Sequence, residues 1–338
     1  MPTLLAGFDD RLLRVAVEEN GWTATTLLEG GDIQAVAAHP GAPDRWFVGT
    51  FERGLQRSRD GGASWNEVGS ETIEPDAVTS VAVHPSDPAV VYAGTEPSRV
   101  YRSADGGTSW RHLEGLTDLP SADRWSFPPR PSTHHVRWIE VDAADPEHLY
   151  ISIEAGALVQ SRDAGETWTD HVPDARRDNH ELTTHPAAPD HAWAAAGDGF
   201  AETADGGETW QHSQHGLEHR YCWSVAADPD NPDRLLLSAA KGPGRAHTPG
   251  RAESYVYRRE THDLDDDPAW TRSGEGLPDG KGMLRPVLER GEEAGTVFAA
   301  TNLGLFRTDS MGTKWRALPL EWPSALESQP PSGLVVLH

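Results

Sequence analysis

Short apolar segments, separated by turn-forming residues, recur along the whole chain. One pattern is an apolar segment, a His-Pro or Asp-Pro turn and a second apolar segment, as in IQAVAAHPGAPDRWFVGT from Ile33, VTSVAVHPSDPAVVYAGT from Val78 and WSVAADPDNPDRLLLSAA from Trp223. Such runs predict pairs of adjacent β-strands. No segment has the periodicity of a strongly amphipathic helix, so the pattern indicates an all-β protein.

A second repeated element is an octapeptide of the form Ser/Thr-x-Asp-x-Gly-x-x-Trp. Near-complete copies occupy residues 58–65, 103–110, 161–168 and 203–210, and a fifth copy at 308–315 has Ser310 in place of the Asp. The Asp can accept hydrogen bonds from backbone N–H groups of its own turn, and the Gly supplies a positive φ. The Trp can fill the space between neighbouring sheets. We interpret the octapeptide as a structural turn and not as a catalytic motif.

Counting these elements predicts a seven-bladed β-propeller that forms one domain. First strands begin near Ile33, Val78, Val136, Glu181, Trp223 and Leu284, and the fifth of these units lacks the octapeptide but keeps Trp270. Residues 4–28 and 333–337 are expected to complete a seventh blade, which removes exposed sheet edges. The expected blades are 33–68, 78–114, 136–172, 180–214, 222–273, 284–319 and the composite of 4–28 with 333–337.

The octapeptide resembles the Asp box (BNR repeat) of sialidases, sortilin-type receptors and photosystem II assembly factors. This resemblance implies a propeller that is either a glycosidase-like hydrolase or a noncatalytic assembly module. Sialidases have six blades and an N-terminal Arg-Ile-Pro motif, whereas this chain has seven predicted blades and lacks that motif. A true sialidase is therefore not expected.

Charge and composition restrict the partners. The 53 Asp and Glu against 29 Lys and Arg give a formal charge of −24 along the chain, which argues against nucleic-acid binding and suggests a halophilic, haloarchaeal protein. The single cysteine excludes an internal disulfide and a cysteine-based zinc site. No apolar run predicts a membrane span, and no signal peptide is recognised, so a cytoplasmic location is expected.

The binding site is expected on the face opposite the octapeptides. The Pro-containing turns share the octapeptide face, which gives His39, His84 and His185 a structural role. Two long connections, 116–133 and 241–254, are expected to cover the opposite channel mouth. The candidate ligand-binding residues there are His134, His135, Arg137, His180, Arg220, Trp223, Lys241 and Arg285.

Three functions remain open at this stage. In the first, Arg137, Arg220 and Arg285 hold a small anionic or carbohydrate-like substrate, with Tyr221 as nucleophile. Glu154 and Asp198 then act as acid and base. In the second, a metal is bound by Glu154 with histidines drawn from His134, His135, His180, His219 and His247. In the third, the propeller binds a protein partner without catalysis, and no cofactor is required.

Overall fold

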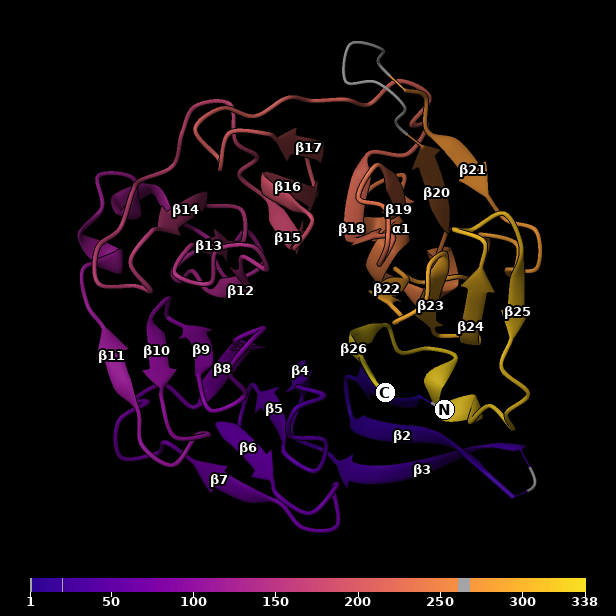
Figure 1. Cartoon of the computed structure of the whole chain (residues 1–338), viewed down its shortest axis with the longest axis horizontal. Helices are drawn as coiled ribbons and strands as arrows, with labels where there is room; N and C mark the ends of the chain where they lie inside the picture. The colour runs from indigo at the N-terminus through magenta and orange to yellow at the C-terminus, as the bar shows by residue number, and fades with distance from the viewer. Residues whose placement is uncertain (1, 20, 261–267) are drawn as a thin grey trace.

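A computed structural model describes residues 2–19, 21–260 and 268–338, and within them the strands form seven sheets around a central axis (Figure 1). The all-β, seven-bladed propeller is thereby confirmed. In chain order, six of the sheets contain the strands β4 (Ile33–Ala38), β5 (Trp46–Thr50), β6 (Leu55–Ser58) and β7 (Asn66–Val68); β8 (Ala77–Val83), β9 (Val91–Glu96), β10 (Val100–Ser103) and β11 (Arg111–Leu113); β12 (Val136–Val141), β13 (Leu149–Ile153) and β14 (Ala157–Ser161); β15 (Asn179–His185), β16 (Ala188–Ala196) and β17 (Gly199–Thr203); β18 (Tyr221–Ala227), β19 (Arg234–Ala240), β20 (Ser254–Glu260) and β21 (Thr271–Ser273); and β22 (Val287–Arg290), β23 (Thr296–Thr301), β24 (Gly304–Asp309) and β25 (Trp315–Ala317).

The seventh sheet joins the two ends of the chain. It has the order β26-β1-β2-β3, formed by β26 (Pro331–Leu337), β1 (Thr3–Phe8), β2 (Arg11–Glu18) and β3 (Gly21–Glu29). Strands β1 and β26 are antiparallel, with Thr3 opposite Leu337, and the labels of the two termini lie close together in Figure 1. Leu4 and Leu334 from these strands are buried in the same hydrophobic cluster. The predicted closure by N- and C-terminal strands is confirmed.

The third and fourth blades differ from the expected four strands. Their fourth positions are reduced to the isolated bridges Gln160–Thr169 and Glu202–Gln211. In the third blade Pro173 follows closely and has no N–H to donate to a longer ladder. The turn between β20 and β21, where the fifth unit lacks the octapeptide, includes residues 261–267, which lie outside the described residues.

The octapeptide turns share one hydrogen-bonding scheme. Asp105 Oδ1 accepts the backbone N–H groups of Thr108 and Ser109 at 2.9 and 2.8 Å, and the Asp60, Asp163 and Asp205 carboxylates accept equivalent backbone N–H groups. Serine or threonine at the first position accepts the N–H of the glycine four residues later, as Ser103 does from Gly107 at 2.8 Å. The predicted role of these Asp residues in the turn is therefore confirmed.

Burial of the octapeptide tryptophans is uneven. Trp110 and Trp210 are 8% and 5% exposed, as expected, and Trp315 of the fifth copy is 2% exposed. Trp65 and Trp168 are only partly buried, which is less than the large burial between blades that the repeat predicts. Both still pack against the clusters between their blades.

Turn-to-turn hydrogen bonds place the octapeptides and the Pro-containing turns on the same face. Gly61 N donates to Asp44 O at 3.0 Å, and the equivalent bond recurs from Gly106 to Ala89 and from Gly206 to Asp190, both at 2.8 Å. The imidazole Nε2 of His39 lies 2.8 Å from Pro85 O, and that of His185 lies 3.0 Å from Pro229 O. His84 Nδ1 accepts the N–H of Ser86 at 3.1 Å. These histidines connect or order turns, in agreement with their predicted structural role.

The connections on the opposite face contain the short helices. They are η1 (Leu116–Asp118) and η2 (Ala122–Arg124) in the first long connection, α1 (Pro243–His247) and η3 (Pro249–Arg251) in the second, and η4 (Ser324–Leu326) before β26. None of the helices in the described ranges is long and apolar enough to cross a membrane.

Candidate functional site

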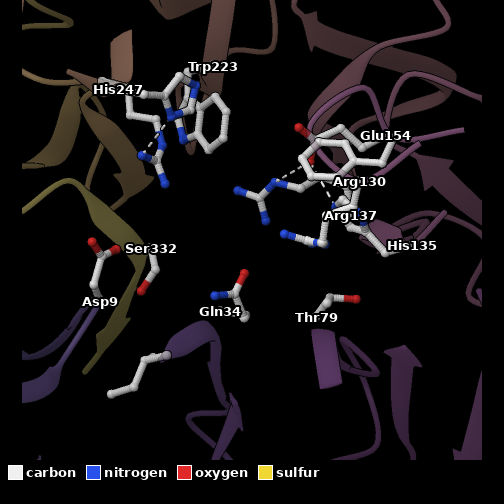
Figure 2. Close-up of a pocket in the computed structure, with 13 residues that line it drawn as sticks. Asp9, Gln34, Thr79, Arg130, His135, Arg137, Glu154, Trp223, His247 and Ser332 are labelled. Carbon is white, nitrogen blue, oxygen red and sulfur yellow. Dashed lines mark hydrogen bonds and ion pairs between the residues drawn. The ribbon is translucent and has the colours of Figure 1, made fainter. Parts of the chain in front are cut away.

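A cavity of about 160 Å³, drawn in close-up in Figure 2, is lined by residues that lie outside the octapeptide turns. The ends of the inner strands and the two long connections supply its walls. The lining residues are Asp9, Ile33, Gln34, Thr79, Phe127, Arg130, His135, Arg137, Glu154, Trp223, His247, Arg285 and Ser332. Figure 2 shows Asp9 and Ser332 on one side and His135, Arg137 and Glu154 on the other. We call this space the mouth cavity.

Two of the three guanidinium groups at the mouth cavity have no carboxylate within hydrogen-bonding distance among the described side chains. Arg130 forms a bidentate ion pair with Glu96, with N–O distances of 2.9 and 2.6 Å. Arg137 Nε is 3.7 Å from Glu154 Oε2, beyond hydrogen-bonding distance. Among the described side chains, no carboxylate oxygen lies within 4.0 Å of an Arg285 nitrogen. Arg285 Nε is buried without a hydrogen-bond partner.

Both of these guanidinium groups, those of Arg137 and Arg285, lie against the ring of Trp223. The Cζ atoms of Arg137 and Arg285 lie 4.8 and 4.1 Å from the centre of the Trp223 ring. Cation–π attraction stabilises each position without using the N–H donors, of which one, on Arg285 Nη1, lies 3.2 Å from His247 Nδ1. Burial, and then the charge of Arg137, lower the pKa of Arg285 to about 10, so Arg285 remains protonated at neutral pH. The cavity therefore holds two cations whose hydrogen-bond donors are available.

A chain of hydrogen bonds through His247 and Tyr221 orients the guanidinium group of Arg285. Its Nη1 lies 3.2 Å from His247 Nδ1, and His247 Nε2 lies 2.9 Å from the Tyr221 hydroxyl oxygen. Burial and the charge of Arg285 lower the pKa of His247 to about 3, which keeps the imidazole neutral. Nδ1 then accepts from Arg285, and Nε2–H donates to Tyr221. Burial raises the pKa of Tyr221, so its hydroxyl stays protonated.

Glu154 is the carboxylate in the opposite wall. Its Oε2 lies 2.9 Å from His135 Nε2, and His135 Nδ1 lies 3.5 Å from Glu96 Oε2. Burial opposes ionisation of Glu154, but the hydrogen bond from His135, together with the charges of His135 and Arg137, holds its pKa well below the usual range. Glu154 is therefore ionised at neutral pH and cannot act there as a general acid.

The structure separates the sequence-predicted residues into three groups. The mouth cavity is lined by His135, Arg137, Glu154, Trp223, His247 and Arg285. His180 and Tyr221 lie beside Trp223, with ring-centre distances of 4.3 and 6.5 Å, but they do not line the cavity. The residues outside it are His134, Asp198, His219, Arg220 and Lys241.

Each outlying residue has another environment. His134 packs edge-on against Trp125 at 5.5 Å, and His219 Nδ1 lies 2.5 Å from the Tyr257 hydroxyl. Asp198, Arg220 and Lys241 are exposed. As a result, Glu154 and Asp198 do not face one another in this cavity. Among the described residues, the five candidate histidines also do not converge on a common metal position.

The predicted ligand-binding set lacked several lining residues. Phe127 and Arg130 come from the first long connection, and His247, predicted only as a possible metal ligand, comes from the second; both connections were expected to cover the mouth. Asp9, Gln34, Thr79 and Ser332 also line the cavity. These four are small or common polar residues with no distinctive spacing, and only the closed ring brings them to one place.

Comparisons with known proteins show the fold but no family. No protein-family model and no curated protein matches the sequence. Among solved structures, the GH74 enzyme of Niastella koreensis aligns with a TM-score of 0.68 and 17% identity over 93% of this chain and 51% of that chain. A GH74 xyloglucanase from Xanthomonas campestris gives 0.66 and 16% over 93% and 52%. This chain thus spans about half the length of those enzymes.

A shorter propeller matches more completely in length. The structure of YCF48 bound to D1 peptide aligns with a TM-score of 0.56 and 16% identity, over 87% of this chain and 82% of that chain. At these identities the comparisons establish the β-propeller alone. Function has to be argued from the site, because one fold supports many activities.

Proposed function

We propose that the protein binds a small anionic ligand in the mouth cavity, between the guanidinium groups of Arg137 and Arg285. The observation that carries this proposal is Arg285, a protonated and largely enclosed cation with no carboxylate partner within 4.0 Å among the described residues. A buried charge without a partner is costly, and a bound anion would compensate it. Guanidinium donors also match the geometry of carboxylate and phosphate oxygens.

Cavity size and surface favour a compact anion over a sugar ring. The volume of about 160 Å³ is below that of typical pockets for drug-sized ligands. Trp223 is only 4% exposed because the two arginines, His180 and His247 surround it, so it offers little open face for stacking on a sugar. The carbohydrate-like alternative therefore has less support than a carboxylate, phosphate or sulfate.

Isothermal titration calorimetry with sulfate, inorganic phosphate and citrate tests this proposal. Arg285→Gln and Arg137→Gln should each weaken binding of the best anion at least ten-fold, which corresponds to about 1.4 kcal/mol. Arg220→Gln is the matched control, since Arg220 is exposed and does not line the cavity. Absence of anion binding by the unmodified protein, or an equal loss in all three variants, would contradict the proposal.

A second candidate is hydrolysis of an anionic glycoside, with Asp9 as the acid and Glu154 as the base or nucleophile. The supporting observation is that these carboxyl groups lie on opposite sides of the cavity in Figure 2. Desolvation raises the pKa of Asp9, whereas that of Glu154 is held low. Opposite shifts of this kind characterise acid and base pairs. Aryl glycosides of uronic acids should then be cleaved, and Asp9→Asn should abolish cleavage without abolishing anion binding.

A protein partner is the third candidate, and its support is the length match to YCF48, whose structure contains a D1 peptide. In that case the arginine pair would bind a carboxylate of the partner. A partner of this kind should compete with the best small anion for the mouth cavity. Retained partner binding in Arg285→Gln would place the interaction elsewhere.

A further inference from the structure

His180 is fully buried beside the mouth cavity, and one of its ring nitrogens has no hydrogen-bond partner. Its Nδ1 lies 2.6 Å from the backbone oxygen of Cys222, so Nδ1 carries the hydrogen and donates it to that carbonyl. In the neutral imidazole Nε2 then presents a lone pair. This Nε2 has no hydrogen-bond partner among the described residues, and His180 is 0% exposed, so water does not supply one from the surface.

Two carboxylates face this lone pair. His180 Nε2 lies 3.9 Å from Glu154 Oε1 and 3.9 Å from Asp178 Oδ1. These distances exceed that of a direct hydrogen bond, so none of the three groups satisfies another. The three ligand atoms lie within 4.8 Å of one another. The three atoms all carry lone pairs and repel one another, and no hydrogen-bond donor of the described residues lies between them. A cation bound at the centre of the three atoms would remove this repulsion.

We propose that Glu154, Asp178 and His180 bind a divalent first-row transition-metal ion. Two ligands at 2.1 Å from an ion on tetrahedral corners are separated by about 3.4 Å, so the two His180–carboxylate separations of 3.9 Å need to shorten by only about 0.5 Å. This ion site shares Glu154 with the lining of the mouth cavity, but it uses neither Arg137 nor Arg285, which carry the proposed anion binding. Glu154 uses Oε2 toward His135 and Oε1 toward His180.

The groups behind the three ligands have the arrangement that metal sites require. The carbonyl of Cys222 fixes the ring and tautomer of His180, His135 orients the Glu154 carboxylate, and Ala155 N donates to Asp178 Oδ1 at 3.1 Å. Gly197 leaves space for Asp178, because a Cβ at this position would collide with Asp178 Oδ2. The ligand orientation is therefore imposed by the surrounding chain before any ion arrives.

The ligand types indicate the class of ion. Oxygen-only sites suit Mg²⁺ and Ca²⁺, whereas a neutral imidazole favours Mn²⁺, Fe²⁺, Zn²⁺ and their neighbours. Burial lowers the pKa of His180 to about 4, despite the adjacent Glu154 charge, so the ring is available as a neutral ligand at physiological pH. One imidazole with two carboxylates leaves further coordination positions for water or a ligand oxygen.

Calorimetric titration of the chelator-stripped full chain with MnCl₂ and with ZnCl₂ tests the site. One of these ions should bind with about one equivalent, and Asp178→Asn should weaken that binding at least ten-fold. Asp198→Asn is the matched control, since it removes one carboxylate charge nearby from an exposed residue outside the triad. It should change the affinity less than about two-fold. His180→Gln, checked for folding by circular dichroism, should also lose the site.

Three results would overturn the inference. The first is absence of Mn²⁺ and Zn²⁺ binding by the unmodified chain. The second is unchanged binding in Asp178→Asn, which would place the ion among other histidines and carboxylates. The third is equal or tighter binding of Mg²⁺ or Ca²⁺, which would show that the imidazole is not a ligand. Because binding itself is measured, failure here leaves the anion proposal standing.

Discussion

Glu140, Glu181 and Glu289 are buried like Glu154, but they lack an equivalent set of cationic partners among the described residues. Glu181 and Glu289 line a constriction of about 40 Å³ below the mouth cavity. Burial raises the pKa of Glu289 to about 7 and likewise that of Glu140 to about 7. Burial also raises the pKa of Glu181 well above its usual value, although Ser224 and Val225 N–H donate to it.

Replacing Glu289 by Gln should therefore change how stability depends on pH. The native carboxyl holds its proton up to about pH 7, whereas the unfolded one loses it near 4.5, so ionisation of Glu289 lowers stability as pH rises between these values. Glu289→Gln should raise the free energy of unfolding at about pH 8 by on the order of 1 to 3 kcal/mol relative to its effect at about pH 4. Chemical denaturation at both pH values measures this difference.

The buried histidines titrate in the same pH range and change stability in the opposite direction, in the variant as in the unmodified protein. The control is therefore the difference between the two proteins, measured at each pH. An effect of Glu289→Gln that is equal at both pH values would contradict the raised pKa. Loss of stability at both would instead show that the carboxyl makes a specific native hydrogen bond.

For single residues, the sequence predicted which side chains lie at the mouth better than it predicted which atoms they contact. Arg137, Trp223 and Arg285 were correctly placed on the mouth side because their strand positions determine their face. Asp178 was missed as the partner of His180, although it lies only two residues away in sequence. Which carboxylate oxygen faces which nitrogen depends on side-chain rotamers and on contacts between blades, and no local pattern encodes these.

The fifth octapeptide is the weakest of the turn elements. Lys314 N donates to Ser310 Oγ at 3.2 Å, whereas the equivalent bond to an Asp carboxylate is 2.8 to 2.9 Å in the other copies. Ser310→Asp should restore a charged acceptor and stabilise the protein by about 0.5 to 1.5 kcal/mol. Denaturant unfolding of the full chain measures the gain. An unchanged or lower free energy of unfolding in Ser310→Asp would contradict this prediction.

The tryptophans of the octapeptides should differ in energetic importance. Trp210 is 5% exposed in the cluster between the third and fourth blades, while Trp65 is only partly buried. Trp210→Ala should cost about 3 to 5 kcal/mol, and Trp65→Ala about 1 to 3 kcal/mol because less contact is lost. Thermal unfolding of both variants tests this order. Equal costs would mean that the position of the tryptophan in the octapeptide, and not its burial, determines its contribution to stability.

On the scale of the whole molecule, the net charge of −24 opposes compaction. Raising NaCl from about 0.1 to 1 M should screen this repulsion and increase the melting temperature by several degrees. Arg285→Gln should show the same increase, which separates screening from occupation of the mouth cavity by an anion. A melting temperature that is constant or falls with NaCl would indicate that favourable surface ion pairs outweigh the net repulsion.

The overall architecture was more accessible to sequence reasoning than any site. Octapeptide turns and Pro-containing turns are local patterns, so counting them yielded seven blades and the pairing of the chain ends. The shortened outer strands of the third and fourth blades were not predicted. The length of an outer strand depends on its packing against the next blade and its loops, which local sequence does not encode. The same reason explains why the extent of Trp65 and Trp168 burial was mispredicted.

The antiparallel pairing of Thr3 with Leu337 also sets an order of events during biosynthesis. Strands β1 to β3 leave the ribosome first, but the neighbour on the inner side of β1 is the last strand of this ring to emerge. Domains generally fold as units while they are synthesised, and contacts this distant in sequence are slow to form. The edge of β1 that faces β26 therefore stays unpaired until residues 331–337 have been synthesised. Chaperone capture should concentrate on this edge and end when residues 331–337 become accessible.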